Sequence, residues 1–534
     1  MVIKMPENYA NARSTTGTSI RTKDISPTSG MCPICIEDCP VLCEIGKSAF
    51  RGREVLYPDP EQFGKSTQAS NKNYDMDWSY FQILVDVRGT AGIEPDPEKA
   101  IFANVDIESS AGGIPLRVPI TIAGLGSTDV AKRNWDSLAI GAAISGIPLT
   151  IGENVCGMDP KAKFNGEGKV THSEDLKYRV DKYREFWDSK YGDIIVQTNI
   201  EDKRAGVDSY ALSRLEVNVI ERKWGQGAKA IGGEVRIFDL EKAIMLKKRG
   251  YIVWPDPEDP HVQEAFKNKV FESFERHSRV GMVNEMDFLE DIDLLREKGA
   301  KRIFLKTGAY RPAVVALTMK LASEAKIDLV TFDGAGGGTG MSPVPMMNEC
   351  ATPTIYLEAQ VLKAAELLKK KGRYVPDIAM AGGFINETQI FKGIAMSNFG
   401  DSPIVKAIAM ARAPLTAVMK SNHYVRLAEK DKLPDKFARL YGNRPEQFFI
   451  ATTELEERFG KDAKKLPWGA IGLYTYLIDR IGVGLKQLMA GARKWKLSLL
   501  DRNDLAALTE RASRVTGIPM IDDIEQDVME EILG

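Results

Sequence analysis

The sequence has little histidine or cysteine and no long hydrophobic run. Its four histidines are scattered, so no metal-ligand spacing and no Ser-His-Asp or Cys-His arrangement is visible, which disfavours a hydrolase. The longest apolar runs, such as Val118–Leu125, have the length of strands and predict no membrane span. The first twenty residues contain no apolar stretch typical of a secretory signal, so we expect a cytoplasmic protein.

Charge of either sign is also not in excess. The 534 residues include 72 Lys and Arg against 74 Asp and Glu, which gives a net charge of −2 without long blocks of like charge. This balance predicts no nucleic-acid-binding surface. The length is sufficient for one large α/β core with flanking elements, or for two domains.

Cysteine is rare but clustered. Four of the six cysteines lie within twelve residues, namely Cys32, Cys35, Cys39 and Cys43. Disulfides are rare in cytosolic proteins, whereas four thiolates can hold a [4Fe–4S] cluster or a zinc ion. The spacing Cys-x₂-Cys-x₃-Cys-x₃-Cys also follows one face of a helix, which would bury the thiols as small apolar groups. Cys156 and Cys350 are expected to be buried apolar residues.

The segment Leu329–Pro343 combines a buried strand with a glycine-rich loop. An apolar, β-branched run ends at Asp333, and five glycines follow between Gly334 and Gly340. Glycine permits positive φ and allows backbone N–H groups to approach a ring edge or an anion closely. The pattern favours a ligand-binding loop at a strand end over a flexible surface turn.

Three motifs occur in the order found in the FMN-binding synthase domain of glutamate synthases. They are KWGQGAKAIGGEV at Lys223–Val235, GGGTGMSP in the glycine-rich loop and MAGGFINET at Met380–Thr388. The chain resembles this family from about Pro119 to Leu427, which implies a (β/α)₈ TIM barrel that binds FMN. The resemblance places four residues of the glycine-rich loop at the cofactor: Gly337, Gly338, Thr339 and Gly340.

From Pro119 onward, short apolar segments alternate with amphipathic ones and, together with the resemblance, indicate eight barrel strands. The expected strands are Ile120–Ala123, Pro148–Ile151, Ile194–Gln197, Ala228–Ile231, Ile303–Lys306, Leu329–Phe332, Ile378–Ala381 and Ala407–Met410. The long interval after the fourth strand contains WPDPEDPHVQEAF, a candidate insertion or lid. We expect an N-terminal extension with the four-cysteine segment (1–117), the FMN-binding barrel (118–427) and a helical C-terminal segment (428–534).

The loops after the seventh and eighth strands are the expected phosphate site. Gly382 and Gly383 follow the seventh strand, and Ala411 and Arg412 follow the eighth. Glycine amides and a helix N-terminus there would donate hydrogen bonds to a phosphate. The alternative is a pair of glycines that ends a helix, together with a surface arginine.

The resemblance also assigns residues to the flavin ring. Gly126 and Ser127 after the first strand, and Glu153 after the second, align with family positions near the flavin. Lys223 aligns with a family lysine at the pyrimidine side of the ring, where a cation would stabilise the negative charge of reduced flavin. Gln226 belongs to the same motif. Without the resemblance, a solvated helix lysine explains Lys223 equally well.

Lys306 closes the apolar strand IFLKTG and is expected to point into the barrel mouth. A buried ammonium there requires an anionic partner, and in the family this position contacts the oxo-acid substrate or the flavin region. We therefore predict Lys306 and Lys223 as catalytic residues, and a small anionic substrate that is a 2-oxo acid or an amino acid.

The chain departs from the family at several places. Ala335 and Gly336 stand where a His-Asp pair is usual, and VMKSNHYVRLAEK lacks the cysteines of the family's iron–sulfur segment. No glutaminase domain precedes the barrel, so free ammonia, an amine or another ammonia-supplying chain is required. These losses favour a [4Fe–4S] cluster over zinc at the four-cysteine segment, because a flavin needs electron delivery.

Taken together, the residues and the resemblance predict an FMN-dependent oxidoreductase of the glutamate synthase type, acting on CH–NH₂ donors in amino-acid biosynthesis. It would convert 2-oxoglutarate to glutamate with electrons from a donor protein or a reductase subunit, and we expect a homo-oligomer. Two alternatives stay open. One is an FMN-dependent oxidoreductase or isomerase acting on another anionic metabolite, and the other is a non-catalytic electron-relay subunit.

Overall fold

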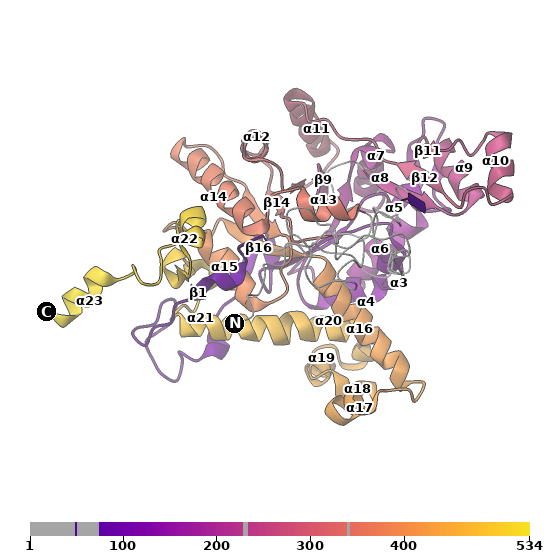
Figure 1. Ribbon diagram of the computed structural model, residues 1–534. Helices are drawn as coiled ribbons and strands as arrows, with labels where there is room; N and C mark the ends of the chain where they lie inside the picture. Colours follow the sequence, from indigo (N-terminus) through magenta and orange to yellow (C-terminus); the bar gives the residue numbers. More distant parts are fainter. Residues whose placement is uncertain (1–48, 51–73, 228–232, 339–341) are drawn as a thin grey trace, which may run out of the picture.

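The computed structural model describes residues 49–50, 74–227, 233–338 and 342–534. Eight parallel strands close into a barrel in chain order, with helices around it (Figure 1). The strands are β4 (Ile120–Leu125), β5 (Leu149–Ile151), β8 (Ile194–Thr198), β9 (Val219–Lys223), β13 (Arg302–Gly308), β14 (Leu329–Asp333), β15 (Asp377–Ala381) and β16 (Val405–Met410). The predicted (β/α)₈ barrel is confirmed.

The fourth barrel strand was predicted wrongly. It is β9, whereas the predicted segment Ala228–Ile231 lies outside the described residues. β9 has the sequence VIERK, in which only two apolar residues precede three charged ones. Its pairing with β8 and β13 stabilises a strand that its own apolar content does not mark. As a result, Lys223 ends the fourth strand instead of preceding it.

The amino end of the barrel is closed by a hairpin. Strands β2 (Ser109–Ala111) and β3 (Ile114–Leu116) place apolar side chains against the inward-facing Phe304 and Leu329. The backbone N–H of Gly112 at the hairpin tip donates to Asp377 at 2.9 Å. With this end covered, the carboxyl ends of the strands are left for a ligand, as in other barrels of this class.

Helices surround the barrel between successive strands. They are α3 (Asp129–Arg133), α4 (Trp135–Ile144), α5 (Val155–Met158), α6 (Glu174–Arg184), α7 (Ile200–Arg204), α8 (Val207–Arg214), α11 (Glu285–Glu297), α12 (Pro312–Glu324), α13 (Val344–Glu349), α14 (Thr354–Lys370), α15 (Glu387–Met396) and α16 (Arg412–Ala428). A small hairpin of β6 (Lys163–Phe164) and β7 (Val170–His172) lies between α5 and α6. Most of these helices bury an apolar face against the barrel, which gives one continuous core.

The expected insertion between the fourth and fifth strands is an antiparallel sheet with two helices, seen at the right of Figure 1. It consists of β10 (Glu234–Ile237), α9 (Leu240–Lys248), β11 (Ile252–Trp254), α10 (Pro260–Lys267) and β12 (Phe274–His277). A separate apolar cluster that includes Leu246 and Phe274 forms its core. The insertion is therefore a folded unit and not a simple loop.

The segments that flank the barrel in sequence pack against each other. Short strand β1 (Phe81–Ile83) pairs antiparallel with β17 (Leu505–Ala507). The chain after α16 is mostly helical. Its elements are α17 (Asp435–Tyr441), α18 (Pro445–Phe448), α19 (Thr452–Phe459), α20 (Trp468–Tyr474), a π-helical stretch (Thr475–Gly482), α21 (Val483–Gly491), α22 (Glu510–Thr516) and α23 (Gln526–Leu533). The division into three parts at residues 117 and 427 stays a prediction.

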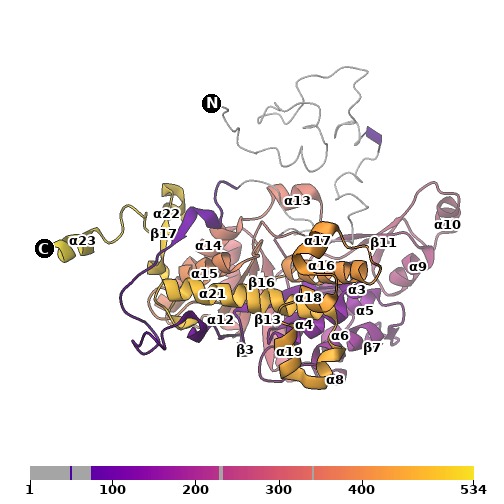
Figure 2. The ribbon, with the colours of Figure 1, turned by 90° about the horizontal axis from the view of Figure 1, so that it is seen from below.

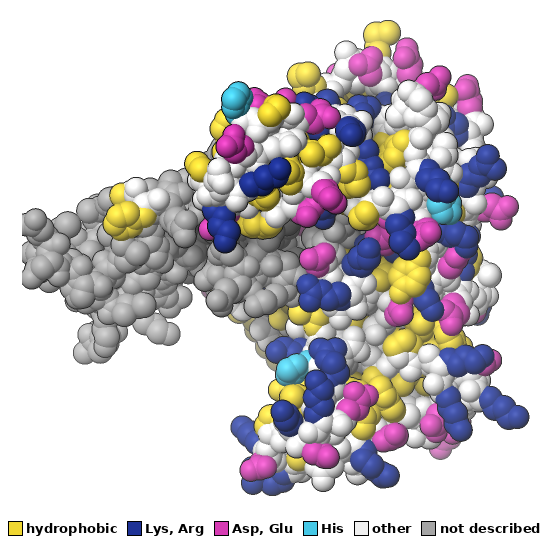
Figure 3. Space-filling model, turned by 90° about the vertical axis from the view of Figure 1, so that its right-hand side faces the viewer, with side chains coloured by type: hydrophobic (Ala, Val, Ile, Leu, Met, Phe, Trp, Pro, Cys, Tyr) yellow, Lys and Arg dark blue, Asp and Glu magenta, His cyan; other side chains and the backbone are white. Residues whose placement is uncertain are grey.

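Helices α20 and α21 form one long rod that crosses the barrel, while α23 extends away from the body in both views (Figures 1 and 2). α20 packs mainly against α4 and α16. Figure 3 shows positive and negative side chains intermixed on the face that carries the insertion, with apolar side chains in small separate groups. Among the described residues, none of the helices has both the length and the apolar character needed to cross a membrane.

Glu358 of α14 provides a test of the core. It is fully buried, and neither carboxyl oxygen has a hydrogen-bond partner among the described residues. Burial raises the pKa of Glu358 well above its usual value, and Arg502 offsets this only partly. Stability is therefore lost as pH rises from the unfolded pKa toward the folded one. We expect Glu358→Gln to raise the free energy of unfolding by about 1–3 kcal/mol at pH 8.5, and by less at pH 5.5.

Urea denaturation at the two pH values measures this difference. Glu324→Gln, at an exposed position of α12, is the matched control and should give the same small change at both. Equal effects of Glu358→Gln at pH 5.5 and pH 8.5 would mean that burial does not raise the pKa of Glu358, because the carboxyl group would then be ionised in the folded protein at both pH values.

Candidate functional site at the barrel mouth

Two lysines stand side by side at the carboxyl ends of adjacent strands. Lys223 ends β9, Lys306 lies near the end of β13, and their Cα atoms are cross-strand partners. Both belong to the inward-facing set, because Val219, four residues before Lys223, and Phe304, two residues before Lys306, line the barrel interior. Their side chains are only 11% and 7% exposed. Two buried cations at this spacing require anionic partners.

Carboxylates from other strands provide part of this compensation. The Nζ atom of Lys223 lies 2.7 Å from Oε1 of Glu153 and also donates to Oε1 of Gln226 at 2.7 Å. The Nζ atom of Lys306 lies 3.5 Å from Oδ2 of Asp333. The structure thus brings together Glu153, Lys223 and Gln226, and it adds Asp333, which was not among the predicted site residues. The signal for Asp333 was present, because it is the polar residue that ends an apolar strand.

Below the lysines lies a second polar pair that the sequence analysis missed. Glu221 of β9 and Gln197 of β8 are cross-strand partners, and Nε2 of Gln197 donates to Oε1 of Glu221 at 2.5 Å. Both side chains are buried. Burial raises the pKa of Glu221, while Lys306, the hydrogen bond from Gln197 and Lys223 act in the opposite direction. The misplaced fourth strand hid this inward-facing position.

The glycine-rich loop after β14 contacts the loop after β15. The Oγ1 atom of Thr354 donates to the carbonyl oxygen of Gly382 at 2.7 Å and lies 3.1 Å from that of Ala335. Gly382 and Gly383 have φ of +119° and +96°, and Gly336 has +128°, values that favour glycine. Gly337 and Gly338 belong to the same loop, whereas Thr339 and Gly340 lie outside the described residues.

Helix α16 begins directly after β16, beside these glycines in the barrel order. Its N-cap residue is Ala411, which provides no side-chain hydrogen bond, and its first turn contains no acidic residue. The side chain of Arg412 is exposed. The first amides of a 17-residue helix are therefore not capped by a side chain, which suits an anion at this N-terminus.

Next to β16 in the barrel, the loops after β4 and β5 are in close contact. A Cβ atom on Gly126 would lie 2.6 Å from the carbonyl oxygen of Glu153, so glycine is required for this approach. The carbonyl of Gly126 accepts from Arg179 at 2.9 Å, and Ser127 follows it half-buried. Gly126 thus sets the position of the backbone that carries Glu153.

A side cavity of about 510 Å³ is lined in part by Lys223. Its inner end contains Glu153, Lys223 and Gln226. The wall includes Trp224, whose ring meets that of Phe288 edge to face at 4.9 Å between centroids. The segment that follows the insertion, residues 279–284, forms another part of the lining. The cavity gives a small molecule access to the polar cluster from outside the barrel.

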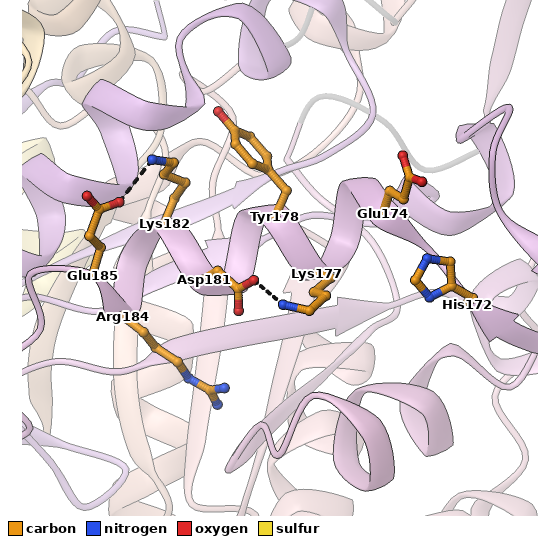
Figure 4. A pocket seen from close by; sticks show the side chains of 8 residues that line it. All are labelled: His172, Glu174, Lys177, Tyr178, Asp181, Lys182, Arg184 and Glu185. Carbon is orange, nitrogen blue, oxygen red and sulfur yellow. Dashed lines mark hydrogen bonds and ion pairs between the residues drawn. The ribbon is translucent and has the colours of Figure 1, made fainter.

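A larger but shallow groove runs along α6, away from these residues (Figure 4). The groove is lined by side chains of α6 and of residues next to it in the sequence. Along the helix, Lys177 pairs with Asp181, and Lys182 pairs with Glu185. It contains none of the predicted site residues. Such i, i+3 and i, i+4 pairs are typical of a solvated helix.

The four-cysteine segment (Cys32, Cys35, Cys39 and Cys43) lies outside the described residues, so its ligand stays a prediction. The described residues contain no group of three or more His, Cys, Asp or Glu side chains suited to a metal ion. Cys156 is buried as expected. Cys350 is exposed, contrary to the prediction, because it follows α13 in the connection to α14.

These features define a class. The chain is a (β/α)₈-barrel protein with a polar site at the carboxyl ends of its strands, where glycine loops and an uncapped helix N-terminus lie on one side and two largely buried lysine side chains on another.

Within that class, residues 268–413 match the conserved region of glutamate synthase. The chain is also 24% identical over 425 residues to the glutamate synthase large subunit-like protein of Rhizobium meliloti (strain 1021), which covers 76% of this chain and 78% of that one. The predicted resemblance to the glutamate synthase family is confirmed. The matched region contains Lys306, the glycine-rich loop and the Gly382–Gly383 pair, and it begins after Lys223.

Solved structures with a similar arrangement include a sulfite-bound variant of flavocytochrome b2, with 11% identity, 90% of each chain covered and a TM-score of 0.46. A mandelate oxidase variant with (S)-mandelic acid has 11% identity, covers 79% of this chain and 84% of its own, and has a TM-score of 0.42. The assignment of a closed barrel to this chain depends on its own strand pairing and not on these similarities.

Proposed function

We propose that the protein is an FMN-dependent oxidoreductase of the glutamate synthase type that reductively aminates a 2-oxo acid, with 2-oxoglutarate as the first candidate. The match to the conserved glutamate synthase region supports the coarse class, a flavin-dependent oxidoreductase. The observation that carries the proposal is the pair of lysines Lys223 and Lys306 on adjacent strand ends, whose side chains are only 11% and 7% exposed. Such a pair suits a carboxylate and a ring that gains negative charge.

The residues at the mouth fit FMN. Gly382, Gly383 and the first amides of α16 at Ala411 and Arg412 would hold the phosphate, because they offer close backbone approach and uncapped donors. Lys223 would face the pyrimidine edge of the ring. Further residues on the ring side would be Gly126, Ser127, Gln226, Gly337 and Gly338.

Bound FMN in its reduced form would supply the hydride that reduces the imine formed from the oxo acid and the amino donor. The residues of the chain would bind the substrate and orient the groups around it. Lys306 holds a substrate carboxylate, and Glu153 and Gln226 keep the ammonium of Lys223 in place.

The remaining parts of the proposal concern partners and location. Electrons would come from a donor protein or a reductase subunit, through a [4Fe–4S] cluster on the four-cysteine segment. A homo-oligomer in the cytoplasm and a role in amino-acid biosynthesis belong to the same proposal.

The first experiment is an absorption spectrum of protein purified without oxygen, with iron and sulfide assays on the same sample. Flavin bands and reoxidation of the reduced protein by 2-oxoglutarate with ammonium would support the proposal, and glutamate as the product would complete it. Protein without flavin would overturn it. About four irons per chain would support the cluster, as four thiolates allow.

Gly382→Ala tests the phosphate grip. A Cβ atom at this position would lie 2.4 Å from Oγ1 of Thr354 and 2.7 Å from the carbonyl oxygen of Gly334, at a φ of +119°. Both loops must shift, so we expect the flavin content per chain to fall severalfold while the protein stays folded, at a cost of about 1–3 kcal/mol. Gly400→Ala is the matched control, because Gly400 has a φ of +118° with no atom within 4 Å of the added Cβ. Equal flavin loss in both variants would contradict a specific role of Gly382.

A second candidate keeps FMN but changes the substrate. Ala335 and Gly336 offer no polar side chain in the glycine-rich loop, where the family usually has a His-Asp pair. An oxidoreductase or isomerase acting on another anionic metabolite is consistent with this loss. Comparing 2-oxoglutarate with other oxo acids in the reoxidation experiment separates the two candidates.

A further inference from the structure

Glu221 is the carboxylate at the barrel mouth with the weakest compensation. Glu153 and Asp333 each lie beside one lysine ammonium, at 2.7 and 3.5 Å. Glu221 has no ion pair within 4 Å among the described residues, and it is only 4% exposed. Its charge depends on Lys306 and Lys223 at longer range, and both lysines are already paired with other carboxylates.

The only hydrogen-bond partner recorded for Glu221 among the described residues suits either protonation state. Nε2 of Gln197 donates to the carboxylate at 2.5 Å, while Oε1 of Gln197 is buried and has no hydrogen-bond partner among the described residues. A half-turn of the amide would direct this oxygen to the O–H of a protonated Glu221. Gly124 on β4, which β5 separates from β8 in the barrel, leaves room for the amide, because a Cβ atom there would lie 2.9 Å from Oε1 of Gln197.

We propose that Glu221 takes up one proton when an anion binds to Lys306 and Lys223, and that Gln197 adapts its amide to the acid that forms. The inference deepens the proposed function, on which it rests for the identity of the anion. The step is a simple protonation: a proton from solvent joins the Glu221 carboxylate, and no bond to substrate or cofactor changes. Glu221 is therefore a positioning residue, and its protonation offsets one negative charge of the bound anion.

The direction follows from the groups that face Glu221. Burial raises the pKa of Glu221 and Glu153 adds to this, whereas Lys306, Gln197 and Lys223 lower it. An anion that neutralises the lysines removes part of the lowering effect, so the pKa of Glu221 rises on binding. Proton uptake is greatest between the pKa values of the free and bound forms, and the affinity for the anion falls as pH rises through this window.

The test has one arm without ligand and one with it. In the first, Lys306→Met imitates neutralisation of the lysine, and infrared spectra follow the C=O band of the protonated carboxyl group. The band assigned to Glu221 by its absence in Glu221→Gln should persist to a higher pH in Lys306→Met, by about one pH unit. A band that titrates at the same pH in both proteins would overturn the inference.

In the second arm, flavin-containing protein is titrated with 2-oxoglutarate in two buffers of different ionisation enthalpy. Wild type should take up a fraction of one proton per site that depends on pH, Glu221→Gln should bind with almost no uptake, and the control Glu324→Gln should match wild type. Equal uptake by wild type and Glu221→Gln would overturn the inference. Absence of binding alongside a shifted infrared band would count against the proposed substrate while supporting the role of Glu221.

Discussion

Lys306→Met is expected to lower the turnover of the flavin-containing protein by about 10²- to 10³-fold, because it removes a preorganised cation from the place where substrate charge is held. The side chain of Lys306 is 7% exposed, and its ammonium lies 3.5 Å from Asp333. Methionine has a similar length and is easily accommodated in a core. The loss should therefore appear in turnover while the fold is kept.

Steady-state kinetics with 2-oxoglutarate, together with flavin content and a thermal unfolding curve, would measure this effect. Lys320→Met is the matched control, since Lys320 lies on α12 and is 48% exposed in a pair with Glu285. Unchanged kinetics in Lys306→Met would remove Lys306 from the site. A variant that lost both flavin and its unfolding transition would instead assign Lys306 to the fold.

The sequence was sufficient for most of the barrel because its strands are strongly apolar. Segments such as ITIAGL and VKAIAM bury nearly every residue, and this pattern marks parallel strands covered on both faces. The pattern missed β9 because two of its three inward-facing residues, Glu221 and Lys223, are charged. Charged residues interrupt the apolar run by which a buried parallel strand is recognised. In β9 they lie at the carboxyl end of the strand, where the candidate site is.

Individual site residues could be predicted from the sequence only where they belong to a motif shared with the family. Lys223, Gln226 and Glu153 come together as the resemblance implied, because the strand order places the ends of β5 and β9 at one mouth. The Gln197–Glu221 pair required the pairing register, which no local pattern contains. Cys350 was misjudged because its exposure depends on the loop between two helices and not on the residue type.

The outer face of β9 carries an ion network that fixes this strand to its helices. Arg222 donates to Asp208 of α8 at 2.6 Å, to Asp291 of α11 at 2.9 Å and to Thr198 of β8 at 2.6 Å. Its side chain is 7% exposed, and those of the two aspartates are 3% and 8% exposed. Burial tends to raise the pKa of Asp208, but Arg222 outweighs this and holds the pKa below its usual value. The contribution of Asp208 to stability is therefore lost as pH falls through that lowered pKa.

Arg222→Met should lower the free energy of unfolding by about 3–5 kcal/mol, because it leaves the buried carboxylate of Asp208 without its cation. Asp291 keeps Lys203 at 2.9 Å, so the double change Arg222→Met, Asp208→Asn should recover most of the loss. Urea denaturation at pH 7 measures both variants, with Arg133→Met on the exposed face of α3 as the control. A single variant as stable as wild type would show that the network is solvated. Since Arg222 lies between Glu221 and Lys223, that result would also mean that the two inward-facing charges are positioned by the barrel backbone alone.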